Sequence, residues 1–171
     1  HEQALRMGRE LEKLNFYWLE EPLYDVDLYG LKMLTTKLDI PICGTEVIAG
    51  SHYSAAYCIQ ERIVDMVRTD VSWKGGVTAV MKTARLAESF GVQCELHSTI
   101  YHPLELVNLH CACAMRNCKF FELLWPPDVY NFGLLEDIHI DEEGYAHVPT
   151  GPGMGIGLDW DLIDNATVAV L

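Results

Sequence analysis

The chain has 171 residues, and 25 acidic against 12 basic side chains give it a formal net charge of −13 at pH 7. Half of the residues are hydrophobic, which excludes a disordered acidic tail because such tails lack the apolar residues that build a core. No apolar run approaches the roughly 18–20 residues of a membrane span. An acidic chain without a basic stripe also argues against nucleic acid and anionic membranes as partners.

Six cysteines lie within apolar stretches, and the sequence contains no CxxC motif. A core-rich chain of this length does not need disulfide bonds, so we expect buried thiols in a reducing cytoplasm. Cys111, Cys113 and Cys118 could form a metal cluster, but their spacing does not favour that interpretation.

Short apolar segments alternate with longer amphipathic ones along most of the chain. We expect strands at 16–19, 40–43, 63–67, 92–96 and 119–124, and helices at 1–14, 28–38, 54–59, 77–87 and 104–114. This alternation, without hairpin signals, indicates parallel strands joined by right-handed crossovers. The sequence opens at His1 within a predicted helix, so we expect further sequence upstream.

An ionisable residue follows each expected strand, once per βα unit of about 25 residues. In a (β/α)8 barrel the C-terminal ends of all strands converge on one site, whereas a doubly wound sheet brings only neighbouring ends together. The phasing favours an α/β fold in which residues 1–136 form about five βα units, the C-terminal part of a TIM-type barrel. Five units cannot close a barrel of eight, so about three strands should precede the chain. The residues in phase are Glu20, Glu46, Asp70, His97 and Glu122.

The last part of the chain, residues 137–171, has a different character. Residues 137–147 predict a short hairpin with its turn at Glu143–Gly144. Residues 149–157 are rich in glycine and proline and lack the lysine of a phosphate-binding loop. We expect a hairpin and tail that pack toward a capping domain outside this chain.

Glu20 and Glu46 follow adjacent strands and suit Mg²⁺, which prefers oxygen ligands. Alternatively, these acids only solvate the loop ends. A carboxylate such as Asp70 can fix the tautomer of His97 and raise its pKa, which would make this pair a general acid/base. If Asp70 serves His97, a third metal ligand should lie upstream.

Further candidate side chains follow the later strands. Glu122 could hydrogen-bond a developing oxyanion if burial among acids retains its proton. Lys74 could bind a substrate carboxylate or act as a base, although its position at a helix entry slightly favours solvation at the surface. Tyr101 and His102 follow His97 and could contact a substrate. A metal, a His–Asp dyad and an acid together suit removal of the proton alpha to a carboxylate, through an enediolate whose charge the metal shares.

Several motifs carry a resemblance to the mandelate racemase-like branch of the enolase superfamily, over nearly the whole chain. They are Trp18–Pro22 (WLEEP), Gly44–Glu46 (GTE), Arg68–Asp70 (RTD), Trp73–Thr78 (WKGGVT), Glu95–Ser98 (ELHS), Phe121–Leu123 (FEL) and Pro152–Ile156 (PGMGI). The resemblance implies that Glu20 and Glu46 are two of three Mg²⁺ ligands, that Asp70 and His97 form the acid/base dyad, and that Glu122 stabilises the enolate. It implies that Glu21 does not bind the metal and that the tail returns to an α+β capping domain.

One departure from the family pattern concerns the strand of Asp70. Relatives with a lysine there place it three residues after the aspartate, where this chain has Trp73, and Lys74 follows. A tryptophan at this position is similar to acid-sugar dehydratases of the branch. The resemblance therefore implies a hydro-lyase that dehydrates an aldonate or aldarate, with a racemase or epimerase of a 2-hydroxy acid as the alternative.

A second departure is the absence from this chain of the first three strands, the third metal ligand and a lysine base. We therefore expect the isolated chain to be incomplete and inactive. The resemblance also implies that the full-length enzyme is a homo-oligomer. A non-catalytic remnant or structural module is the alternative from another class.

Overall fold

The computed structural model describes residues 1–98 and 102–170. Its sheet has four parallel strands, each paired with the next one along the chain. They are β1 (Leu19–Glu20), β2 (Ile42–Gly44), β3 (Met66–Thr69) and β4 (Gln93–Leu96). This order confirms the predicted α/β fold with a parallel sheet.

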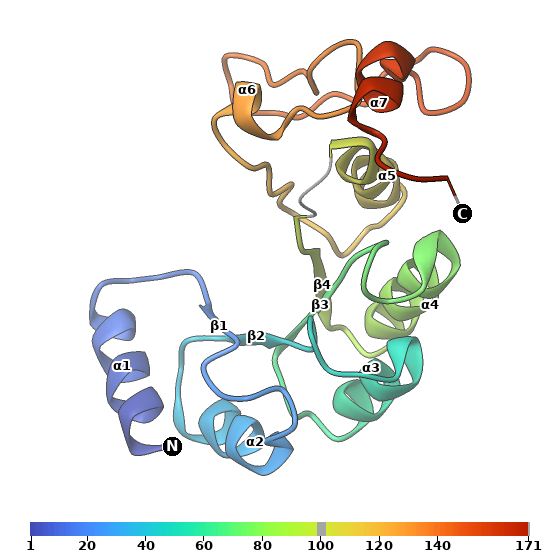
Figure 1. The fold of residues 1–171 in the computed structure, drawn as a ribbon. Coiled ribbons are helices and arrows are strands. Elements are labelled where there is room, and N and C mark those ends of the chain that lie inside the picture. Colours follow the sequence, from blue (N-terminus) through green and yellow to red (C-terminus); the bar gives the residue numbers. More distant parts are fainter. Residues whose placement is uncertain (99–101, 171) are drawn as a thin grey trace.

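Helices connect the strands, as the alternating pattern predicts. Figure 1 shows α2, α3 and α4 along one side of the curved sheet, while α5, α6 and α7 lie beyond β4. Among the described residues, no helix is both long and apolar enough to cross a membrane. The helices are α1 (Glu2–Lys13), α2 (Leu28–Lys37), α3 (Ser51–Gln60), α4 (Gly76–Ser89), α5 (His102–Cys113), α6 (Pro127–Tyr130) and α7 (Trp160–Ala166).

The main core lies between the sheet and its helices. Leu34 of α2 is fully buried there, together with Val67 of β3 and Cys94 of β4. Val67 and Cys94 are register partners, and so are the next residues along these strands, Arg68 and Glu95. Because successive side chains of a strand point to opposite faces, the charged pair faces away from the helices. The core therefore fixes which side of the sheet carries the polar residues.

The expected fifth strand, 119–124, is not a strand in the described part of the chain. The backbone N–H groups of Lys119 and Phe120 donate instead to the carboxylate of Glu95, at 3.1 and 3.0 Å. The Glu95 side chain of β4 thus accepts from two backbone N–H groups that would otherwise have paired with a neighbouring strand. The short helices α6 and α7 were not predicted either.

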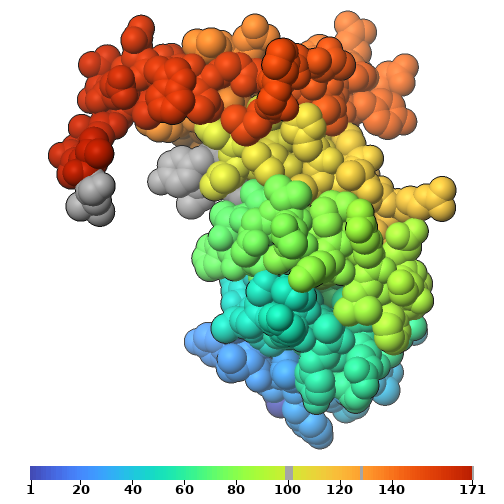
Figure 2. All heavy atoms as spheres, turned by 90° about the vertical axis from the view of Figure 1, so that its right-hand side faces the viewer, coloured from blue at the N-terminus to red at the C-terminus, as the bar shows by residue number. Residues whose placement is uncertain are grey.

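The tail packs on α5. Leu134 pairs with Leu158 in an antiparallel bridge, and His110 of α5 contacts the Met154 carbonyl at 2.9 Å. Figure 2 shows the tail as a layer over α5. The expected hairpin is present in short form: Ile140 and Ala146 form an antiparallel bridge, flanked by backbone hydrogen bonds from Asp141 to Tyr145 and from His147 to His139, each 3.0 Å. The boundary at residue 136 and the packing toward a capping domain stay predictions.

Candidate active site

The predicted residues collect at one edge of the sheet. Glu20 ends β1, and Glu46 lies two residues beyond β2. Asp70 and His97 directly follow β3 and β4. Glu122 reaches the same edge, because one of its oxygens lies 2.8 Å from the backbone nitrogen of residue 98, next to His97. The topology therefore brings all five phased residues together.

The Asp70 carboxylate is fully buried and accepts several hydrogen bonds. Its Oδ1 accepts from the backbone N–H and hydroxyl of Ser72, at 2.7 and 2.8 Å, and from the Trp73 N–H at 2.6 Å. Its Oδ2 lies 3.1 Å from Nδ1 of His97. Burial alone would raise the pKa of Asp70, but the hydrogen bonds from His97, Trp73 and Ser72 hold it below its ordinary value. Asp70 is therefore an ionised acceptor for the imidazole.

His97 lies between two carboxylates. Its Nδ1 faces Asp70, and its Nε2 lies 3.3 Å from Oε1 of Glu46. The hydrogen bond to Asp70 raises the pKa of His97 above 6.5, with a further contribution from Glu46, although burial opposes the shift. Asn108 of α5 holds this strand end by donating to the His97 carbonyl, at 3.0 Å, and accepting from the Val71 N–H, at 3.2 Å.

The loop after β2 sets the position of Glu46. Thr45 has a φ of 83°, which is a strained conformation for a β-branched residue. Its hydroxyl donates to the Arg68 carbonyl at 2.9 Å, and the Glu46 N–H donates to Oε1 of Glu21 at 2.9 Å. Burial raises the pKa of Glu46, while His97 and Arg68 oppose the shift. Glu21 thus supports the loop, and Glu20 is the member of the pair that faces the site.

Arg68 is a central residue to which the sequence analysis gave no role. It is only 2% exposed. Its Nη2 lies 2.8 Å from Oε2 of Glu122 and 3.4 Å from Oε1 of Glu20, and its Nε lies 3.7 Å from Oε2 of Glu46. Burial would lower the pKa of Arg68, but Glu122 and Glu20 raise it above its ordinary value, so the guanidinium stays charged. A charged residue within an otherwise apolar strand could have signalled this role.

Glu122 does not meet the condition under which it was expected to keep a proton. Its side chain is 46% exposed. Its Oε2 accepts hydrogen bonds from Arg68 and from the Ser98 N–H, both at 2.8 Å. Oε2 of Glu122 is thus engaged as an acceptor by two donors, one of them cationic.

Glu20 and Glu46 offer oxygen donors of the kind that Mg²⁺ prefers. Both carboxylates approach the same guanidinium, so they converge on one cationic position. The described residues contain no group of three or more His, Cys, Asp or Glu side chains placed to hold a metal ion. Mg²⁺ commonly takes only one or two carboxylates and completes its shell with water and substrate oxygens. The carboxylate oxygens of Glu20 and Glu46 are therefore the type of ligand that suits Mg²⁺.

The expected substrate-contacting residues have different placements. Lys74 is buried rather than solvated, because its ammonium group donates to the Ile48 carbonyl. Burial lowers its pKa. His102 is 1% exposed in α5, and neither ring nitrogen has a hydrogen-bond partner among the residues that the structure describes. Tyr101 lies outside the described residues. Contact of these residues with a substrate stays a prediction.

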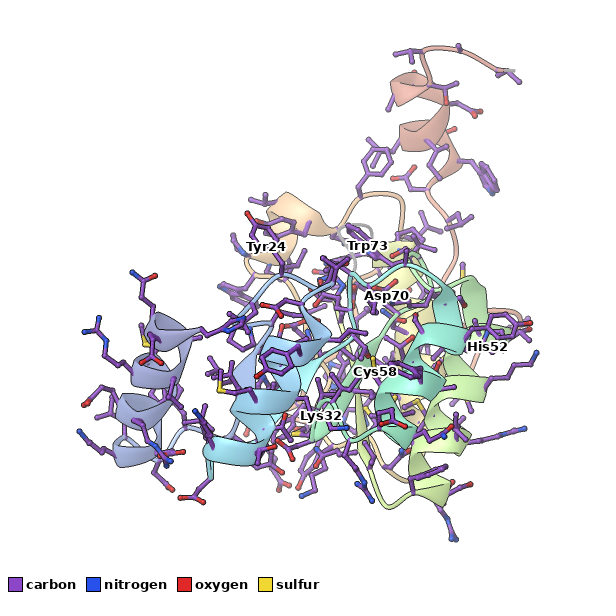
Figure 3. The ribbon with its side chains drawn as sticks, turned by 90° about the horizontal axis from the view of Figure 1, so that it is seen from below. Tyr24, Lys32, His52, Cys58, Asp70 and Trp73 are labelled. Carbon is purple, nitrogen blue, oxygen red and sulfur yellow. The ribbon has the colours of Figure 1, made fainter. Side chains whose placement is uncertain are left out.

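Trp73 forms an exposed wall beside the dyad. Figure 3 shows it near Asp70 at one end of the sheet. Its ring lies 6.5 Å from the His97 ring, nearly perpendicular to it, and the residue is 61% exposed. An amphipathic ring in this position can contact a ligand that approaches His97.

Comparison with known proteins shows which family and which relatives this chain resembles. Residues 1–162 match the family described as enolase C-terminal domain-like. Arabinonate dehydratase of Saccharolobus solfataricus is 36% identical over 155 residues, which are 90% of this chain and 41% of that protein. The chain thus spans less than half the length of this relative.

Two solved structures are similar over 95% of the chain and 42% of their own length. D-glucarate dehydratase of Agrobacterium tumefaciens, complexed with magnesium, has a TM-score of 0.85 and 39% identity. A mandelate racemase/muconate lactonizing enzyme of Polaromonas sp. JS666 has a TM-score of 0.76 and 33% identity.

Proposed function

Because the chain belongs to the enolase C-terminal domain-like family, we propose that it carries the strand-end residues of a Mg²⁺-dependent sugar-acid dehydratase. The substrate would be an aldonate or aldarate. One observation carries the proposal: His97 hydrogen-bonds the buried Asp70 at Nδ1 and directs Nε2 toward the edge where Glu20 and Glu46 converge. A protonated imidazole in this position can donate to a departing hydroxyl group.

The reaction follows from the protonation state of His97. A base on the other face of the substrate takes the proton alpha to the carboxylate. The electron pair left on that carbon forms a double bond as the neighbouring C–O bond breaks. His97 gives the proton on Nε2 to the leaving oxygen, so that water departs, and tautomerisation yields a 2-keto-3-deoxy acid. The raised pKa of His97 supports this role, because it favours the protonated form of the imidazole, from which a proton can be donated.

Glu20 and Glu46 would hold the metal ion, with water and substrate oxygens as further ligands. When bound, Mg²⁺ polarises the substrate carboxylate and shares the negative charge that develops on it. Glu122, held as an acceptor by Arg68, would position a substrate hydroxyl rather than donate a proton. We infer that further ligands and the opposite base come from outside these residues.

The relatives favour dehydration over racemisation as the outcome. Two of the three similar proteins described above are named as dehydratases, of arabinonate and of D-glucarate. Both substrates are small carboxylates, which agrees with a site at which two acidic side chains face a shared cation.

The proposal is tested with the natural gene product that contains this sequence. It is incubated with Mg²⁺ and a panel of aldonates and aldarates, and the products are analysed by mass. A product lighter by one water supports dehydration, whereas a product of unchanged mass with inverted configuration indicates the racemase. His97→Asn and chelation of Mg²⁺ should each abolish turnover. Turnover that survives both changes would refute the proposal, and turnover by residues 1–171 alone would refute the need for further ligands.

A further inference from the structure

Arg68 contacts three carboxylates that come from three different segments of the chain. Its guanidinium pairs with Glu122 at 2.8 Å, Glu20 at 3.4 Å and Glu46 at 3.7 Å. The neighbouring ammonium group of Lys74 is turned to the Ile48 carbonyl. Arg68 is therefore the main fixed cation among these three acids in the described part of the chain.

The three contacts are not equivalent. Only the contact with Glu122 is a hydrogen bond, whereas those with Glu20 and Glu46 are longer ion pairs. The Nε atom of Arg68 is buried and has no hydrogen-bond partner within residues 1–98 and 102–170. Buried donors of purely structural arginines are normally satisfied. Arg68 is thus firmly attached to Glu122 and only loosely attached to the two predicted metal ligands.

We propose that Arg68 is an internal counter-ion that competes with a divalent cation for Glu20 and Glu46. In the metal-free protein it offsets the repulsion between these carboxylates. When the metal ion binds, Glu20 and Glu46 leave the guanidinium, which keeps its hydrogen bond to Glu122. The inference rests on the proposed function, because it takes Glu20 and Glu46 as metal ligands.

The competition has a direction that can be measured. A guanidinium and a divalent cation beside the same carboxylates repel each other, so Arg68 stabilises the metal-free state and weakens metal binding. By linkage, removing the charge must destabilise the metal-free protein and tighten metal binding together. An arginine with a purely structural role would destabilise both states equally.

The test replaces Arg68 by glutamine in the natural gene product, with Arg68→Lys as the variant that keeps the charge. Arg62→Gln is the matched control, because the Arg62 guanidinium donates to the Phe90 carbonyl, at 3.0 Å, and pairs with no acidic side chain among the described residues. Titration calorimetry gives the Mg²⁺ affinity, and thermal unfolding with and without Mg²⁺ gives the shift in Tm that the metal causes. We expect Arg68→Gln to bind Mg²⁺ on the order of tenfold more tightly and to show a larger Tm shift. Arg68→Lys and Arg62→Gln should behave like the wild type.

Each outcome decides the proposal. An unchanged or weaker Mg²⁺ affinity in Arg68→Gln overturns it. If this variant folds only in the presence of Mg²⁺, the result supports it, because the ion then replaces the lost charge. Failure to fold even with saturating Mg²⁺ overturns it. If the wild type binds no Mg²⁺, the metal site of the proposed function fails instead, and the two failures are distinguished.

Discussion

Replacing Asp70 by asparagine should leave His97 in place but make its imidazole ring neutral. The three hydrogen bonds to Oδ1, from Ser72 and Trp73, can persist to the asparagine carbonyl oxygen. The asparagine NH₂ group then takes the place of Oδ2 and donates to Nδ1 of His97, 3.1 Å away. A ring that accepts at Nδ1 is neutral, so Nε2 loses its acidity.

Two magnitudes follow from this geometry. The lost charge-assisted hydrogen bond is worth about 2 kcal/mol, and unfolding free energy should fall by that amount. General acid–base catalysis contributes roughly 10²–10⁴-fold, so kcat of the natural gene product should fall by about 10³-fold. The pKa of His97 should drop in the variant, since the bond to Asp70 is the first cause of its elevation.

NMR titration of the His97 ring and the pH profile of kcat measure these effects. Asp65→Asn is the matched control, because the Asp65 carboxylate accepts from the Ile42 N–H at 2.9 Å, at the opposite end of β3. The control should lose stability without a change in the pKa of His97. The reasoning is refuted if Asp70→Asn leaves that pKa unchanged, or if kcat stays within about tenfold of the control.

Three further predictions concern stability. Leu34→Ala should lower the unfolding free energy by about 3 kcal/mol in urea denaturation, because Leu34 is completely buried in the main core; a loss below about 1 kcal/mol would contradict this packing. Glu95→Gln should cost about 2 kcal/mol and speed amide exchange at 119–120, whose N–H groups donate to this carboxylate; unchanged exchange would contradict the role. The pair of Asp70 and His97 should stabilise the fold most between pH 3.8 and 6.5. Because the pKa of His97 is raised in the folded state, the stability difference between wild type and Asp70→Asn should decline as pH rises through this folded-state pKa. A stability difference that grows with pH would contradict the pairing of His97 with Asp70.

The sequence pattern was sufficient to predict which residues meet at the sheet edge. Their position depends on topology alone: parallel strands end at the same edge, and each βα unit returns the chain there. Even Glu122 reaches the site, although its segment is not a strand, because Glu95 holds the backbone at 119–120 and the Ser98 N–H donates to the Glu122 carboxylate.

The pattern was not sufficient where a side chain finds its partner in a distant segment. Solvation at the surface was the slightly favoured interpretation of Lys74, yet Lys74 is buried, and its ammonium group donates to the Ile48 carbonyl, 26 residues away. Asn108 holds the ends of β3 and β4 from α5, which no local spacing indicates. The sequence pattern did not indicate the roles of Arg68 and Glu95 for the same reason. A charged side chain can be buried only where the fold supplies partners for it.

The period of two along the strands orders these charges into two layers. Arg68 of β3 shares a face with Asp70, which directly follows that strand, and Glu95 of β4 shares a face with His97, which directly follows β4. The inner layer consists of Arg68 and Glu95, which are register partners and almost fully buried. Asp70 and His97 lie one step further along, where the sheet ends and the imidazole is accessible.

The two layers have separate roles: the inner layer positions neighbouring groups, and the outer layer carries the proposed proton transfer. The inner charges orient what surrounds the site: Arg68 directs Glu122, and Glu95 captures the backbone that leads to it. The outer pair lies at the open end of the site, where the imidazole can exchange a proton. A change in the inner layer should therefore alter metal binding and local order, whereas a change in the outer layer should alter the pH profile. The variants of Arg68 and Asp70 measure these two effects independently.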